Sequence, residues 1–250
     1  MIRAVAAEWL KLISTRMPVW TAVAVTLLGL AVALALGYTA YPLSPMFPDK
    51  AATGVALLGV PALMAAASMT VTGEYRSGLI RTTFLATPNR AMVLCAKAVV
   101  AAVFSAVVAG VATVLAVLAA GAVAAPGAAL GLNPTAAASW QTAGAVAVFA
   151  ALAAVLAVGV GALVREAAAT VAVLLMWPLV IETVLGALPS ISDRVGPYLP
   201  FANGLAFTGT RMFAAPYAMA WDRLGSLAYL TAVVAVVFGA GLVVIVRRDA

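Results

Sequence analysis

Few residues of this 250-residue sequence could carry out chemistry, and the missing types are as informative as those present. Histidine is absent, which excludes a Ser-His-Asp triad, a histidine metal site and a histidine proton relay. The single cysteine, Cys95, lies in an apolar run and fits a small core or lipid-facing residue. The three lysines follow Leu10, Asp49 and Ala96, so no Gly-Lys-Ser/Thr phosphate-binding loop is present. The chain is therefore predicted to have no ATPase site, no catalytic residue and no metal site of its own.

One acidic residue stands apart because it interrupts a long apolar run. Glu182 lies about five residues before the end of that run. A carboxylate in lipid is costly, so Glu182 is expected to face a cavity, a partner or the protein interior. Two interpretations stay open: a group in the translocation path that senses a cation or substrate, or a carboxyl that bonds the following segment through Arg194 or Arg211.

The composition explains why chemistry is so sparse. Apolar residues make up 66% of the chain and charged residues 9%, with a mean hydropathy of +1.15. Soluble domains have roughly 45–50% apolar and about 25% charged residues. These values exclude a soluble enzyme, a disordered chain and a nucleic-acid-binding domain. They indicate an integral membrane protein whose surroundings are membrane lipid.

Runs without charge predict six transmembrane helices in one domain, 1–250. About 20 apolar residues in a helix cross the hydrocarbon core. One run is too long for one helix and is divided by glycine, proline and asparagine near 126–134. The predicted spans are about 17–38, 51–72, 91–124, 137–164, 167–187 and 225–246. The fold class is thus an all-α membrane protein with both termini on one side.

The basic residues predict which side that is. With the N-terminus inside, ten of the 14 lysines and arginines fall on the inner side and four on the outer side. Short loops rich in Lys and Arg face the cytoplasm. The sequence therefore predicts a multi-pass protein of the cell (inner or plasma) membrane with cytoplasmic N- and C-termini.

Residues 1–16 are too polar to span the membrane and are predicted to form an interfacial helix. Apolar residues at helical spacing share one face, and charged residues share the other. Trp9, Lys11 and Arg16 are expected to anchor this helix at the inner leaflet. A cleaved signal peptide is the alternative, but the following apolar run is longer than a typical signal core.

Two polar segments interrupt the apolar sequence. The inner one, 73–90, has one acid and three arginines and is long for a connection between helices. The outer one, 188–224, is proline- and aromatic-rich, too apolar for a solvated loop and too broken for one span. Short helices that re-enter the outer leaflet as a hairpin would satisfy both properties.

The inner segment carries a pattern known from a transporter family. The arrangement Glu74-x3-Gly78-x6-Leu85-x2-Pro88-x-Arg90-x6-Lys97 resembles the cytoplasmic loop between spans two and three of type-2 ABC transporter permeases. These are the membrane subunits of ABC exporters of the daunorubicin-resistance, multidrug kind. The opening Glu8-Trp9-x-Lys11-Leu12 is similar to that family's N-terminal segment. Many members have threonine where this chain has Leu79.

The resemblance implies a permease that works as a homodimer or with a sister permease. Cytoplasmic ABC ATPase subunits, separate chains that hold ATP and Mg²⁺, would drive it. The segment from Glu74 to Thr87 would be a coupling helix that docks in the ATPase, and the turn at Arg165 and Glu166 would be a smaller contact. The ATPase-coupling residues implied are Glu74, Arg76, Gly78, Leu79, Arg81, Phe84, Leu85, Pro88, Arg165 and Glu166.

The residues themselves are compatible with that role. Leu79, Ile80, Phe84 and Leu85 would give a short helix an apolar docking face. The alternative is that the arginines only anchor the inner leaflet, and Lys97 is expected to extend back to the headgroups.

An almost charge-free path suits an apolar or amphipathic cargo such as a drug, lipid or peptide. A gradient-driven transporter without an ATPase is the second hypothesis, and Glu182 alone supports it weakly.

Overall fold

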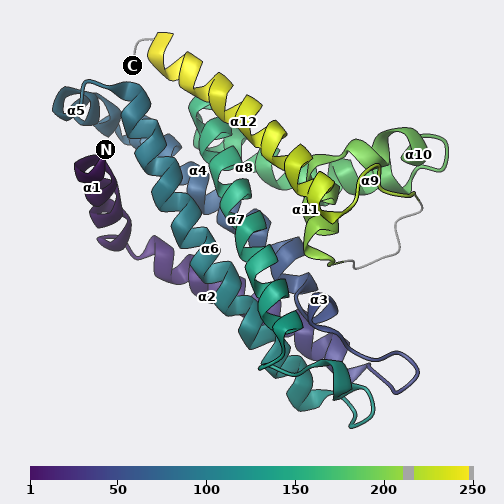
Figure 1. Cartoon of the computed structure of the whole chain (residues 1–250). Helices are drawn as coiled ribbons and strands as arrows, with labels where there is room; N and C mark the ends of the chain where they lie inside the picture. Colours follow the sequence, from purple (N-terminus) through teal and green to yellow (C-terminus); the bar gives the residue numbers. More distant parts are fainter. Residues whose placement is uncertain (211–216, 248–250) are drawn as a thin grey trace.

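The computed structural model describes residues 1–210 and 217–247, which are helical and contain no β-strand (Figure 1). Six helices are long and apolar enough to cross a membrane, which confirms the predicted all-helical class and marks a multi-pass membrane protein. They are α2 (Met17–Tyr38), Val55–Ser77 (π-helix η1, Val55–Gly59, then α4, Val60–Ser77), α6 (Arg90–Val123), α7 (Ala137–Val164), Ala167–Ala187 (α8, Ala167–Met176; π-helix η3, Trp177–Ile181; α9, Glu182–Ala187) and α12 (Arg223–Arg247).

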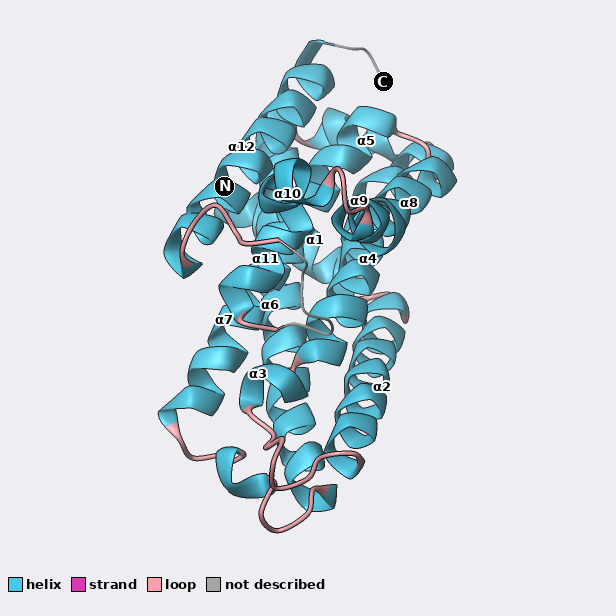
Figure 2. Ribbon diagram, turned by 90° about the vertical axis from the view of Figure 1, so that its right-hand side faces the viewer, coloured by secondary structure: helices cyan, strands magenta, loops and turns pink. Residues whose placement is uncertain are grey.

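Shorter helices connect these six. They are α1 (Ile2–Ile13), α3 (Pro48–Ala51), α5 (Leu79–Ala86), the 3₁₀-helix η2 (Ala129–Gly131), α10 (Ser192–Val195), the 3₁₀-helix η4 (Gly196–Tyr198) and α11 (Pro200–Thr208). Helix α10 extends to one side of the bundle in Figure 1 and so lies on the face turned to the viewer in Figure 2, whereas α11 packs on α12 and α7.

Helices α4 and α7 form the centre of the bundle. They pack against each other, and together they contact α6, α8, α11 and α12, while α2 packs mainly on α6. Helices α7 and α12 approach closely at Gly159 and Gly241: a Cβ on Gly159 would lie 2.9 Å from the Phe238 Cα. Small residues permit such close contacts between spanning helices.

The outer surface of the spanning helices is apolar. Val107 and Val111 on α6, for example, are exposed on the bundle exterior. An exterior of this kind is stable in lipid, where exposed apolar side chains carry no hydration cost.

The second span differs from its prediction at both ends. It begins at Val55 and α4 continues through Ser77, so residues 73–77 are helical and the 73–90 segment is not one loop. Hydropathy marks where a membrane span ends but does not mark where a helix ends. Pro61 follows the π-helix η1 in the first turn of α4, and Pro178 is the second residue of the π-helix η3; each proline removes a backbone donor and widens the local turn.

The start of α1, helix α5 and the end of α12 lie toward the same end of the molecule (Figure 1). Arg90 and Arg165 donate hydrogen bonds to the carbonyls of Ile245 and Val244, at 3.5 and 3.2 Å, and so join α6 and the α7–α8 turn to α12. This end carries most of the basic residues, and we refer to it as the basic end.

Candidate functional site

The candidate coupling segment folds as an elbow of two helices. Helix α4 ends at Gly78, whose backbone is left-handed (φ 73°), a conformation that glycine adopts without a Cβ clash. Helix α5 then runs for eight residues and ends before Pro88, with Thr87 extended. The Asn89 side chain accepts a hydrogen bond from the Met92 amide at 2.9 Å and caps the start of α6.

Helix α5 has an inner and an outer side. Ile80 is buried, and the Phe84 ring lies 5.2 Å from the Arg90 guanidinium, so both face the bundle. Leu79 and Arg81 are exposed, and Leu85 is 82% exposed. The expected docking face of four apolar residues is therefore divided, because Ile80 and Phe84 are one helical turn apart on the side opposite Leu85.

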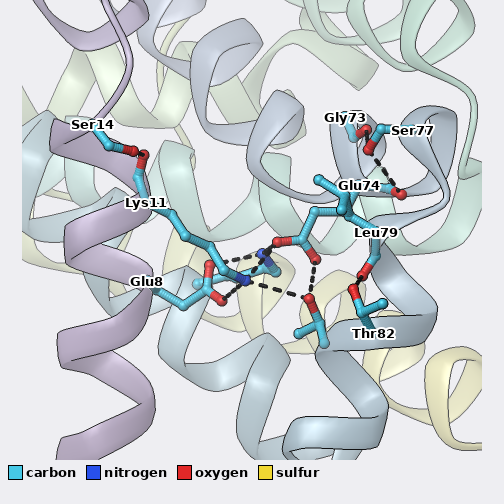
Figure 3. Close-up of polar contacts among 10 residues, drawn as sticks. Glu8, Lys11, Ser14, Gly73, Glu74, Ser77, Leu79 and Thr82 are labelled. Carbon is cyan, nitrogen blue, oxygen red and sulfur yellow. Dashed lines mark hydrogen bonds and ion pairs between the residues drawn. The ribbon is translucent and has the colours of Figure 1, made fainter.

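An ionic cluster of four side chains lies behind the elbow (Figure 3). Lys97 Nζ is 2.7 Å from Glu8 Oε2 and 2.7 Å from Glu74 Oε1. Lys11 Nζ contacts the same two carboxylates, at 2.7 Å from Glu8 and 2.8 Å from Glu74. Thr83 of α5 donates to Glu74 Oε2 at 3.3 Å. The cluster joins α1, α4, α5 and α6 and balances two positive with two negative charges.

The cluster includes two residues that the sequence singled out, Lys97 and Glu74. Lys97 was expected to extend to the headgroups, and that expectation is wrong: its side chain is 2% exposed and bonded to carboxylates. A buried ammonium needs counter-charges, and Glu8 and Glu74 supply them. Glu74, one of the coupling residues that the resemblance implies, has its carboxylate bonded to Lys11 and Lys97 within this chain. Glu8 was not predicted as a site residue.

The two lysines of the cluster differ in exposure. The Lys11 side chain is 47% exposed, whereas that of Lys97 is buried. Partial burial acts to lower the pKa of Lys11, but hydrogen bonds and charge attraction from Glu74 and Glu8 outweigh it and raise the pKa above 10.5. Lys11 is therefore charged at neutral pH.

Helix α1 turns its charged side to the protein and its apolar side outward. Glu8 is buried, while Ile2, Trp9 and Ile13 are exposed. Arg16, at the end of the connection to α2, is exposed as well. An outward apolar face is stable against lipid and unfavourable in water.

The turn between α7 and α8 is held within the chain. Arg165 adopts a left-handed backbone (φ 62°), and its guanidinium lies 5.1 Å from the Tyr75 ring. Glu166 is exposed and caps α8 by accepting hydrogen bonds from the Ala168 and Ala169 amides, bonds that lower the pKa of its carboxyl. Of the remaining predicted coupling residues, Arg76 and Pro88 are exposed beside the elbow.

Glu182 is buried and bonded to the following segment. Its carboxylate accepts hydrogen bonds from the backbone amides of Phe201 (2.9 Å) and Ala202 (2.8 Å) at the start of α11, and from the Trp177 indole (2.9 Å). The π-helix η3 brings residues five apart, Trp177 and Glu182, onto one side. In the described part of the chain Glu182 forms no ion pair, so Arg194 is not its partner; Arg211 lies outside the described residues.

Among the described residues, no group of three or more acidic, cysteine or histidine side chains is placed to hold a metal ion. No family model matches this sequence, and a search of curated proteins finds no match.

Proposed function

We propose that this chain is the permease subunit of an ATP-driven ABC exporter, paired with a second copy or a sister permease and driven by separate ATPase subunits. The observation that carries the proposal is the elbow at the basic end. Helix α5 presents Leu79, Arg81 and Leu85 outward, away from the bundle. Exposed apolar and basic residues on one short helix suit docking in a groove of a partner protein.

The contacts behind α5 support a mechanical role. Thr83 of α5 bonds Glu74, and Glu74 bonds Lys97 of α6 and Lys11 of α1. Arg90, over the Phe84 ring, also bonds the last turns of α12. A displacement of α5 would therefore move the ends of several helices together, which is the coupling that an external motor requires.

The outward apolar face of α1 supports placing the basic end at the inner leaflet. In this arrangement Trp9 lies at the headgroup level and the lysines and arginines face the cytoplasm. The cargo of such a permease would be apolar or amphipathic, because the spanning helices offer almost no charge to bind an ion.

Co-purification tests the proposal. The tagged chain is extracted from its native membrane, and the associated proteins are identified by mass spectrometry and assayed for vanadate-sensitive ATP hydrolysis. We expect a Walker-motif ATPase to be retained by the parent chain and lost from Leu85→Asp. Leu43→Asp is the matched control, because Leu43 is 92% exposed but lies between α2 and α3. Equal ATPase retention by both variants would refute docking through α5.

A further inference from the structure

A partly open cavity of about 220 Å³ lies among the spanning helices, away from the basic end. Its wall is formed by helices α4, α7, α8, α9, α11 and α12 and by the π-helix η3. The wall residues include Met64, Phe149, Ala153, Leu174, Trp177 and Leu230. All of these except Trp177 are buried, so the cavity lies inside the bundle.

The chemistry of the wall selects an apolar occupant. Among the described residues that line the cavity, Glu182 is the only charged one, and its carboxylate accepts hydrogen bonds from the Phe201 and Ala202 amides and from the Trp177 indole. A water molecule needs two or more polar partners, which this wall does not offer. An apolar cavity of about 150 Å³ holds benzene, so this one has room for a longer hydrocarbon.

The cavity opens toward the surface that faces lipid. Val173 and Trp177 line it on the fifth span and are themselves exposed on the bundle exterior, and Val233 and Val237 of α12 are half-buried at its other edge. A hydrocarbon chain could thus pass between the fifth and sixth spans without crossing a polar region. We infer that this cavity binds an acyl chain of a bilayer lipid, entering sideways from the membrane.

This binding site does not depend on the proposed ATPase partner. A chain in the cavity contacts Trp177 on η3 and Phe201 at the start of α11, the two segments that Glu182 holds together. Lipid occupancy would therefore fill the space beneath the hairpin between the fifth and sixth spans.

Photo-crosslinking tests the inference on the purified chain alone. The chain is reconstituted in vesicles of phosphatidylethanolamine and phosphatidylglycerol that contain a phosphatidylethanolamine with a diazirine in one acyl chain. After illumination, modified residues are mapped by mass spectrometry. We expect adducts on the buried residues Ala153, Leu174 and Leu230 as well as on the lipid-facing Val107 and Val111 of α6.

Two variants separate labelling inside the cavity from labelling of the lipid-facing exterior. Ala153→Phe fills the cavity, and Val173→Trp covers its opening from the exposed side without altering the core. In both, adducts at Leu174 and Leu230 should be lost while those at Val107 and Val111 remain, which shows that the photoreactive lipid still reaches the exposed surface of the chain. Adducts confined to Val107 and Val111 in the parent chain would overturn the inference, as would internal adducts that persist in Val173→Trp.

Discussion

The ionic cluster predicts that Lys97 and Lys11 contribute very differently to stability, although both contact Glu8 and Glu74. In Lys97→Met, a buried ammonium is removed and two largely buried carboxylates lose a partner. Removing one member of a buried ion pair costs about 3–5 kcal/mol. We expect the lower end, about 3 kcal/mol, because Lys11 remains within 2.8 Å of both carboxylates. Lys11→Met removes the same charge from a half-exposed position and should cost less than about 1 kcal/mol.

The assay is unfolding in mixed micelles with rising SDS content, followed by circular dichroism. The Lys97→Met midpoint should fall well below that of Lys11→Met, and the difference of about 2 kcal/mol corresponds to roughly a 30-fold change in the unfolding equilibrium. Glu74→Gln added to Lys97→Met should restore part of the loss, because it removes one unpaired charge. Equal losses in the two lysine variants, or a Lys97→Met loss below about 1 kcal/mol, would refute a buried, charge-paired Lys97.

Three further outcomes follow from the described geometry. Glu182→Leu should lower the free energy of unfolding by about 1–3 kcal/mol for each buried donor left unpaired, and Glu182→Gln should lower it less. A melting temperature of Glu182→Leu equal to the parent's would exclude the hydrogen bonds from Glu182 to the start of α11. Gly78→Ala should lower the free energy of unfolding by about 1 kcal/mol, and Gly78→Asn should lower it less, as measured by the same SDS titration. The reason is that no atom lies within 4 Å of the added Cβ, so only the left-handed backbone conformation is strained. Equal losses in the two variants would argue against the left-handed turn. The Glu166 pKa is lowered in the fold, so its ionised carboxylate stabilises the fold above pH 4.5, and this stabilisation is lost as the pH falls below 4.5 through the lower folded-state pKa. The free energy of unfolding of the parent should therefore exceed that of Glu166→Gln by less and less across that acidic range. A difference that stays constant with pH would contradict this expectation.

The membrane spans were predictable because they depend on local composition. The charge-free run before Tyr38 gave the bounds that α2 has, Met17–Tyr38. The end of α4 was not predictable in this way, since residues 73–77 are polar but nothing before Gly78 stops a helix. The resemblance implied one coupling helix from Glu74 to Thr87, but residues 74–77 belong to α4 and the separate helix α5 begins only at Leu79. The division of α5 into inner and outer sides depends on how Ile80 and Phe84 pack on the bundle.

The ionic cluster was missed because it joins residues far apart in sequence. Glu8 and Lys97 are separated by 89 positions, and no local pattern encodes that pairing. One signal was present: Lys97 lies seven residues into a predicted span, and a charge there requires a partner. Glu182 was expected to face a cavity, a partner or the protein interior, and its carboxylate is bonded to backbone amides, whose positions only the folded chain defines.

Transport by reconstituted vesicles tests whether this chain moves cargo only when a partner ATPase drives it. The purified chain is incorporated with and without the co-purifying ATPase, and ATP-dependent movement of an amphipathic dye is recorded. We expect movement only when both proteins and ATP are present, loss of movement in Leu85→Asp, and normal movement in Leu43→Asp. Dye movement by this chain alone, or undiminished ATP-driven movement in Leu85→Asp, would contradict it.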